Sequence, residues 1–333
     1  MSKQGKGEKS MSVKWGILGT ANIAKWCTIP GIREGENCEL YAIAGRDPKK
    51  VESFRQQFGF AKGYVGYDKL LADPDVQAVY IPLPNNIHKE WVIKALRAGK
   101  NVLCEKPLAM NAKEAEEMFA VAKEEGRILM EAYAYLHSPY IDSLRMDLQS
   151  GIIGDVDYVE TEFLTQGYIE DFRLHKELGG GAVYDLGCYC TTMIRSLFDG
   201  DIELVFADAE FGETDVDVFA SVLLKIDKKI RASFNVGMNF TPGCNSRKDK
   251  LFIHGSKGVI CSDVEYNQAG ELRYRVIADG KETERKLYVR QNYTLEAQQL
   301  SRCIENGEAP HISPEFSIKN ARLLDEIFDK IGY

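Results

Sequence analysis

The strongest constraint on the fold is a regular alternation of short apolar segments and amphipathic segments over residues 13–131. The apolar segments have the length and composition of buried strands, and the segments between them have helical periodicity. Strands are expected at 13–18, 40–44, 76–81, 101–104 and 128–131, with helices following residue 19 and at 51–58, 67–72, 88–98 and 111–125. Such alternation is typical of a doubly wound parallel sheet with helices on both faces.

The pattern changes near residue 135. One helix is expected up to about residue 149, and the helical segment 183–197 follows three consecutive glycines at 179–181. Consecutive hairpins predict a meander of antiparallel strands, with one face covered by helices and the other available to a second subunit. Strands are expected at 156–164 and through most of 202–288, with hairpins at 216–226/230–238 and 250–254/258–261 and closing helices at 294–305 and 317–331.

These patterns predict an α/β protein of two domains. An N-terminal Rossmann domain, a doubly wound parallel sheet, is expected at 12–134, and a C-terminal α+β domain with a mainly antiparallel open sheet at 135–333. The second domain is expected to bind substrate and to form a homodimer or homotetramer through its sheet. Residues 1–11 are mostly polar and have no apolar h-region, so we predict a disordered leader and not a signal peptide.

Composition argues against several classes of function. The net charge is −8 and the basic residues are scattered, which disfavours nucleic acid as a partner. The longest apolar runs are far shorter than the roughly 18 residues that a membrane-spanning helix needs. The eight cysteines lack the spacing of a disulfide framework, and Cys188 and Cys190 have no second cysteine pair at ligand spacing. We therefore predict reduced thiols, a cytoplasmic location, no membrane and no metal site.

A dinucleotide-binding turn is expected directly after the first strand. Gly19 opens a short loop into a helix, the position at which a pyrophosphate contacts backbone N–H groups at a helix N-terminus. Ala21 and Ala24 replace two of the three usual glycines, so the motif is weak by itself. The predicted contacts of this loop are Gly19, Thr20, Ala21, Asn22 and Ile23.

Arg46 indicates which dinucleotide is bound. Proteins that hold the ribose 2′-hydroxyl of NAD usually place an acidic residue at the end of the second strand, whereas this chain has Gly45 followed by Arg46. A guanidinium can bind a 2′-phosphate through two hydrogen bonds. NADP is therefore favoured over NAD, although NAD stays possible. The alternative is that Arg46 only caps a surface turn.

Lys106 is the expected centre of the chemistry. The strand 101–104 runs into Glu105, Lys106 and Pro107, which places Lys106 at the carboxyl edge of the sheet, where ligands of open α/β sheets bind. Pro107 disfavours a helical conformation at Lys106, and the bond between the two residues is one of the few that can adopt the cis form. The alternative is a solvated lysine at a strand end.

A second loop is expected to reach the same edge. Two prolines stiffen the segment after the strand 76–81, and this loop should lie close to a bound cofactor. Its predicted cofactor contacts are Leu83, Asn86 and His88. For His88, a role as a helix cap is the alternative.

Asp185 and Tyr189 are expected to complete the site. They are four residues apart in a helical segment, so their side chains emerge on one face of the helix. The glycines at 179–181 remove side-chain bulk where the start of the helix must approach a ligand. Taken without its surroundings, such a pair is usually structural.

In its motifs the chain resembles the Gfo/Idh/MocA family, the two-domain sugar and polyol dehydrogenases that include glucose-fructose oxidoreductase and inositol dehydrogenase. The resemblance rests on WGILGTANIA, VYIPLPNNIHKEW, VLCEKPLAMN and ELGGGAVYDLGCYC, at residues 15–24, 79–91, 102–111 and 177–190. Within the family, these motif sequences are most similar to the NADP-dependent branch that contains xylose 1-dehydrogenase, dihydrodiol dehydrogenase and deoxysugar ketoreductases.

The resemblance implies roles for particular residues. Lys106 and Asp185 are implied to be catalytic, together with Tyr189, where relatives carry His or Tyr. Glu105 and Lys106 are implied to contact the cofactor, and Arg173 is implied to help hold the cofactor or the substrate. Relatives usually have Trp at the position of Phe172, so the chain departs from the family pattern next to Arg173.

The predicted activity is hydride transfer between a nicotinamide cofactor and a sugar, polyol or related cyclic hydroxyl or keto compound. Tyr189 would exchange the hydroxyl proton, with its pKa lowered by Lys106, or Lys106 would transfer the proton itself. Asp185 would bind a sugar hydroxyl or hold the lysine. The alternatives are an NAD-dependent glycosidase of the same family and a non-catalytic NAD(P)-binding regulator.

A polar and aromatic pocket is expected around the substrate, which suits a carbohydrate without identifying it. Its predicted lining is Tyr133, Tyr135, His137, residues 165–168, Arg173, His175 and Phe240.

Overall fold

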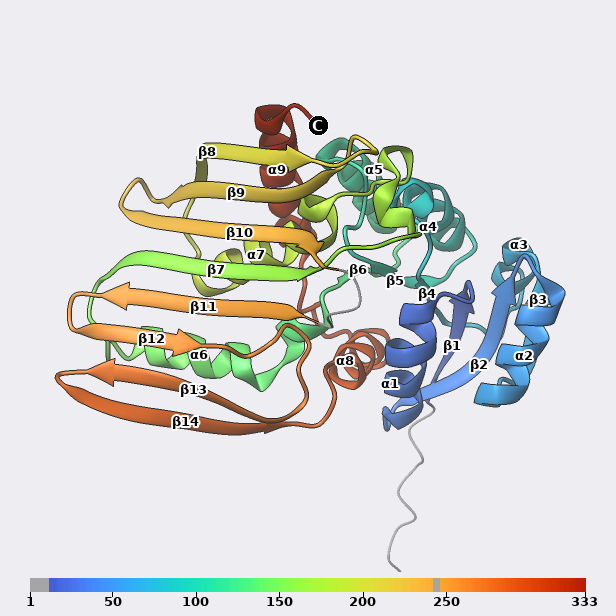
Figure 1. The fold of residues 1–333 in the computed structure, drawn as a ribbon. Coiled ribbons are helices and arrows are strands. Elements are labelled where there is room, and N and C mark those ends of the chain that lie inside the picture. The colour runs from blue at the N-terminus through green and yellow to red at the C-terminus, as the bar shows by residue number, and fades with distance from the viewer. Residues whose placement is uncertain (1–11, 242–245) are drawn as a thin grey trace, which may run out of the picture.

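The structure is a computed structural model that describes residues 12–241 and 246–333. The predicted leader at 1–11 and the cysteine at position 244 lie outside the described residues. Two sheets, joined and flanked by helices, make up the described fold (Figure 1). The prediction of one parallel and one mainly antiparallel sheet is confirmed.

The first sheet has six parallel strands in the order β3-β2-β1-β4-β5-β6. The chain winds outward from β1 in one direction and from β4 in the other, so the carboxyl ends of these two neighbours form the crevice where such sheets bind ligands. Its strands are β1 (Val13–Leu18), β2 (Cys38–Gly45), β3 (Lys62–Val65), β4 (Ala78–Ile81), β5 (Asn101–Glu105) and β6 (Leu129–Ala132).

Helices cover both faces of the first sheet, and this explains why its central strands read as continuous apolar runs. All four residues of β4 are buried. These helices are η1 (Ala24–Thr28) with α1 (Ile29–Glu34), α2 (Pro48–Phe58), α3 (Tyr67–Leu71), α4 (His88–Arg97) and α5 (Ala112–Glu124). The predicted start of α5 is confirmed, since the Asn111 side chain accepts a hydrogen bond from the Glu114 N–H at 2.9 Å.

The second sheet has eight strands in the order β14-β13-β12-β11-β7-β10-β9-β8. Both predicted hairpins are confirmed, β9 with β10 and β11 with β12. Asp227 and Lys228 have positive φ between β9 and β10, as a tight hairpin turn requires. The strands are β7 (Val156–Gln166), β8 (Ile202–Phe211), β9 (Asp217–Ile226), β10 (Ile230–Phe240), β11 (Arg247–Gly255), β12 (Gly258–Ser262), β13 (Gly270–Ala278) and β14 (Lys281–Val289).

The prediction of a simple meander is wrong in one respect. β7 lies in the middle of the sheet, where it pairs parallel with β10 and antiparallel with β11. Hairpin signals identify only strands that follow one another closely in the chain, and β10 and β11 are separated by a longer connection. β7, which precedes both, fills the place between them.

Of the helices after the first sheet, three pack on the second sheet and two link the sheets (Figure 1). α6 (Pro139–Gln149), η6 (Val183–Gly187) and α7 (Cys188–Leu197) pack on the second sheet, while α8 (Asn292–Asn306) packs against α1 and α9 (Pro314–Ile331) against both α5 and β8. Trp15 Nε1 donates a buried hydrogen bond to Ser301 Oγ of α8 at 3.1 Å. In this arrangement, the ends of β7, β10 and β11 face the carboxyl edge of the first sheet (Figure 1). Within the described residues, the helices are too short or too polar to cross a bilayer.

Candidate active site

A cavity of about 480 Å³ lies where the two sheets meet. Its walls come from the dinucleotide turn and the two predicted loops on one side, and from β7, β11 and the segment 171–189 on the other. The lining residues are Ala21, Asn22, Ile23, Pro82, Leu83, Pro84, Asn85, Glu105 and Lys106 from the first part, and Phe163, Thr165, Tyr168, Asp171, Phe172, Arg173, Gly179, Asp185, Leu186, Tyr189 and Arg247 from the second.

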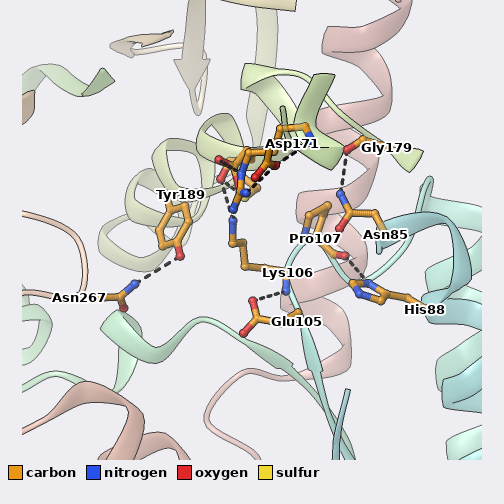
Figure 2. Close-up of polar contacts among 12 residues, drawn as sticks. Asn85, His88, Glu105, Lys106, Pro107, Asp171, Gly179, Tyr189 and Asn267 are labelled. Carbon is orange, nitrogen blue, oxygen red and sulfur yellow. Dashed lines mark hydrogen bonds and ion pairs between the residues drawn. The ribbon is translucent and has the colours of Figure 1, made fainter. Parts of the chain in front are cut away.

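Lys106 reaches across this cavity to the second part of the chain, as Figure 2 shows. Its Nζ donates to the Asp185 backbone carbonyl at 2.9 Å and lies 3.0 Å from Asp185 Oδ1. The Lys106–Pro107 peptide bond is cis, the form that the sequence made plausible. The side chains of Lys106 and Asp185 are only 12% and 11% exposed, so this is a nearly buried ion pair.

Asp185 pairs with a second cation. Arg173 Nε lies 2.7 Å from Asp185 Oδ2, and the Arg173 guanidinium also lies 3.0 Å from Asp171 Oδ1. Burial alone would raise the pKa of Asp185, but Arg173 and Lys106 together hold it well below its usual range. Burial likewise disfavours the Lys106 ammonium, yet Asp185 raises the pKa of Lys106 above its ordinary value. Asp185 is thus ionised and Lys106 protonated at neutral pH.

Tyr189 lies beside Lys106 in an orientation that the sequence did not indicate. The ammonium sits 4.8 Å from the centre of the Tyr189 ring, over its face and not beside its hydroxyl. The hydroxyl accepts a hydrogen bond from Asn267 Nδ2 at 3.3 Å. Burial raises the pKa of Tyr189 and Lys106 offsets only part of this rise. Lys106 therefore acts on the phenol in the predicted direction, but burial has the larger effect and the pKa of Tyr189 lies above its ordinary value. The role of the phenol in proton transfer stays a prediction.

Glu105 fixes the backbone at the base of the lysine. It accepts hydrogen bonds from the Tyr80 hydroxyl and from the Lys106 backbone N–H. Burial raises its pKa, and the neighbouring Lys106 offsets part of this effect. Glu105 lines the cavity, in agreement with its predicted position beside a cofactor.

The dinucleotide turn has the conformation that the sequence suggested. Gly19 has a φ of +128°, and a Cβ there would lie 3.2 Å from Leu83 Cδ2, so the turn needs glycine at this point. Ala21, Asn22 and Ile23 line the cavity at the start of the helix that continues through η1 into α1. Backbone N–H groups at a helix start suit a pyrophosphate.

Arg46 is exposed immediately after β2, as predicted, but it does not line the cavity. It is a neighbour of the Tyr67 hydroxyl and lowers the pKa of that group against the larger effect of burial. Its position agrees with contact to a ribose phosphate outside the cavity, and this role stays a prediction.

The loop after β4 differs in detail from the prediction. His88 is fully buried, with its ring nitrogens 2.7 Å from the Leu83 carbonyl and 3.0 Å from the Pro107 carbonyl. A residue without exposed surface cannot touch a cofactor directly, so His88 ties the two loops together. Asn85 lines the cavity, whereas its predicted neighbour Asn86 is exposed outside it.

Part of the predicted pocket lining is also corrected. Tyr133 and Tyr135 are buried behind Tyr189, with ring centres 5.9 and 5.5 Å from its ring, and His137 packs against His311. From the sequence alone, aromatic residues near a site motif can either line the cavity or pack in the core behind it, and here Tyr133 and Tyr135 do the second. Of the remaining predicted residues, Thr165, Tyr168 and Arg173 line the cavity, while Gln166, Gly167, His175 and Phe240 do not.

Several residues near the site were not predicted, among them the polar residues Asn85, Asp171, Arg247 and Asn267. Asp171 could have been found from its position two residues before Arg173. Arg247 and Asn267 come from strand β11 and a turn of the second sheet, where the sequence has no motif. Only the fold places them beside the cavity.

Comparisons with known proteins agree with this geometry. Residues 13–133 match the oxidoreductase family with an NAD-binding Rossmann fold, and residues 142–261 match the GFO/IDH/MocA C-terminal domain. The trans-1,2-dihydrobenzene-1,2-diol dehydrogenase of Xenopus laevis is 31% identical, over 97% of this chain and 99% of its own. The chain belongs to the Gfo/Idh/MocA family.

Other Gfo/Idh/MocA relatives are similar over comparable lengths. The D-xylose 1-dehydrogenase (NADP(+)) 2 of Haloferax volcanii is 32% identical, over 95% of this chain and 96% of its own. A crystal structure of a 3-ketoreductase from Actinomadura kijaniata with NADP and TDP-benzene has a TM-score of 0.89 and 30% identity, over 96% of this chain and 98% of that one. With the family's fold and motifs in place, this protein is an NAD(P)-dependent oxidoreductase.

Proposed function

We propose that the protein transfers hydride between NADP and a carbon that bears a hydroxyl or keto group in a sugar, polyol or related cyclic compound. The observation that carries this proposal is the meeting of Lys106, Asp185 and Tyr189 at one end of a cavity whose other end is the dinucleotide turn. Sugar and diol dehydrogenases among the relatives support the substrate class.

The residues present fit NADP. The turn at 19–23 offers the backbone N–H groups of a helix start, and Arg46, which lies next to the Tyr67 hydroxyl, is exposed just after β2, where it can approach a 2′-phosphate. Leu83, Glu105 and Arg173 line the cavity from the turn towards Lys106. When bound, NADP supplies or accepts the hydride at its nicotinamide ring.

Two groups of the chain can handle the proton at the substrate oxygen. Lys106 holds an ammonium proton that Asp185 stabilises, and Tyr189 holds a phenol proton that burial retains. In the direction of reduction both can donate to a carbonyl oxygen, which general acid catalysis requires. Asp185 keeps the ammonium in place and balances its charge. The relatives reported above are dehydrogenases and reductases, which favours this activity over the glycosidase and regulator alternatives.

The direct test is to incubate the protein with NADPH or NADP and a panel of aldoses, keto sugars, polyols and dihydrodiols while the nicotinamide absorbance is followed. We expect turnover with at least one neutral polyhydroxyl compound. Absence of turnover across the panel in both directions, in protein that binds NADPH, would contradict the proposal.

The preference for NADP can be tested through Arg46. We expect Arg46→Ala to weaken NADPH binding by about 10- to 100-fold, the value of a lost hydrogen-bonded ion pair, and to change NADH binding little. Arg55→Ala is the matched control, because Arg55 is an exposed arginine on α2 that pairs with Glu52 at 2.8 Å. An unchanged ratio of NADPH to NADH affinity in Arg46→Ala would mean that the phosphate is recognised elsewhere.

We also propose that the protein is a homodimer or homotetramer in the cytoplasm. The outer face of the second sheet exposes Phe206 and Tyr288, at 50% and 73%, on its edge strands β8 and β14. Cys104, Cys188 and Cys190 are buried thiols, which suit a reducing compartment. Light scattering after gel filtration should give a mass that Phe206→Glu lowers, and a monomeric wild-type protein would contradict the assembly.

A further inference from the structure

The hydroxyl of Tyr189 has a partner that no part of the proposed function uses. Asn267 Nδ2 donates a hydrogen bond to the Tyr189 oxygen at 3.3 Å, and Figure 2 shows this hydroxyl directed towards Asn267 and away from the end of the Lys106 side chain. Among the residues that the structure describes, the phenol has no acceptor for its own hydrogen. Among these residues, the Asn267 side chain is therefore the hydrogen-bond partner that can orient the Tyr189 hydroxyl.

The Tyr189 ring itself is held firmly. Phe163, Tyr135 and Tyr266 surround it, with ring centres 5.4, 5.5 and 5.1 Å from its own. The Lys106 ammonium covers part of the ring face. A ring packed in this way keeps its oxygen in place, so the remaining freedom is rotation of the hydroxyl hydrogen about the C–O bond.

Asn267 is equally well fixed. It is the third residue of the turn 265–268 between β12 and β13, closed by a hydrogen bond from the Gln268 N–H to the Glu265 carbonyl at 3.0 Å. Its φ is +62°, a value that favours Gly or Asn at this position of a turn. The Asn292 amide donates to the Gln268 carbonyl at 2.9 Å and anchors the turn to α8.

The amide atom that faces the phenol decides the direction of this contact. With Nδ2 facing it, the Tyr189 oxygen accepts and its single hydrogen is left for another partner, while Asn267 Oδ1 is buried without a hydrogen-bond partner among the described residues. The phenol lines the cavity, where an oxygen of a bound substrate would be that partner. If the side chain at 267 were an acceptor, it would compete with the substrate for the same hydrogen.

We propose that Asn267 is a positioning residue that directs the hydroxyl hydrogen of Tyr189 into the cavity, to be donated to the substrate oxygen. This inference rests on the proposed function, because it concerns how Tyr189 meets the substrate. In this proposal, the turn 265–268 of the second sheet helps to orient the hydroxyl of Tyr189 in α7.

The test compares Asn267→Gly with Asn267→Asp. Glycine suits the positive φ, so Asn267→Gly retains the turn and removes only the amide. We expect it to lower kcat by about 10-fold, equivalent to one hydrogen bond in the transition state, while KM changes little. Asn267→Asp has the same size but presents an acceptor, and we expect a larger loss of kcat. Asp279→Gly, at φ +51° in the distant β13–β14 turn, is the matched control and should be unchanged.

A double-mutant cycle completes the test. In the Tyr189→Phe background, Asn267→Gly should have no further effect on kcat, because the hydroxyl that it orients is absent. Wild-type kcat in Asn267→Gly, full activity in Asn267→Asp, or an equal loss in the Tyr189→Phe background would each overturn the inference. Failure of the wild-type protein to turn over any compound would instead contradict the proposed function.

Discussion

At the scale of single residues, the site is organised by one carboxylate that serves two cations. Asp185 Oδ1 faces Lys106 and Oδ2 faces Arg173, so each oxygen has its own charged partner. Buried charges are costly unless they are paired, and here the pairing stabilises a lysine and an arginine that are largely buried at the cavity wall. The lysine can therefore remain cationic beside the substrate oxygen.

Removal of the Asp185 carboxylate should destabilise the folded protein. We expect Asp185→Asn to lower the free energy of unfolding by about 3–5 kcal/mol, because two buried cations lose their shared partner. The pKa of Lys106 should also fall, since burial would then act with less opposition. Denaturant unfolding measures the first effect. Asp142→Asn, which breaks a surface pair with Arg145 at 3.4 Å, is the control and should cost less than about 1 kcal/mol. Equal losses in both variants would contradict this account.

At the scale of secondary-structure elements, the segment that carries Asp185 is anchored by a buried acid. Asp217 Oδ2 at the start of β9 accepts a hydrogen bond from the Val183 N–H of η6 at 2.6 Å. Gly181 makes room for it, because a Cβ there would clash with Asp217 Oδ1. Burial raises the pKa of Asp217 to about 7, even though backbone N–H groups stabilise its ionised form.

This anchor predicts a pH dependence of stability. The pKa of Asp217 is higher in the folded protein, about 7, than the roughly 3.9 of an unfolded aspartate. The folded state therefore binds the proton more tightly, and this group lowers stability as pH rises between these two values, by up to about 4 kcal/mol. Asn at 217 still offers an acceptor to Val183. Between pH 5 and pH 8, we expect the free energy of unfolding to fall less in Asp217→Asn than in the wild type, because the asparagine does not ionise. The same fall in both proteins would contradict the raised pKa of Asp217.

Sequence patterns predicted most elements but not all of their neighbours. The central strands were found because parallel strands buried on both faces are continuous apolar runs, and α5 because Asn111 caps it. β3 was missed because it is an edge strand with alternating half-exposed residues. Lys106, Asp185 and Tyr189 could be identified from motifs, whereas Asn267 could not, because its role depends on a turn that only the folded sheet brings to the phenol.

At the scale of the whole molecule, the cavity exists because strand ends of the second sheet are held facing the carboxyl ends of the strands of the first sheet (Figure 1). α8 packs on α1, and Asn85 Nδ2 donates a buried hydrogen bond across the cavity rim to the Gly179 carbonyl at 2.9 Å. A contact between the two parts at this place keeps the dinucleotide turn and the helical segment of Asp185 at a fixed separation.

Breaking this contact should affect binding more than folding. We expect Asn85→Ala to cost about 1–2 kcal/mol of stability, for one buried hydrogen bond left without its donor, and to raise the KM for substrate. Asn86→Ala is the matched control, because Asn86 is the exposed neighbour outside the cavity. An unchanged KM for substrate in Asn85→Ala would contradict this account, and a rise in the KM for NADPH in Asn86→Ala would support the predicted contact of Asn86 with the cofactor.

The central claim is that the Lys106 ammonium, held by Asp185 across the cavity, acts on the substrate oxygen. The most direct measurement is the turnover of Lys106→Met together with its dissociation constant for NADPH, with Lys94→Met on the exposed face of α4 as control. We predict a loss of kcat by at least about 100-fold, as expected for removal of a proton donor, with NADPH binding largely retained. Wild-type turnover in Lys106→Met would contradict the account.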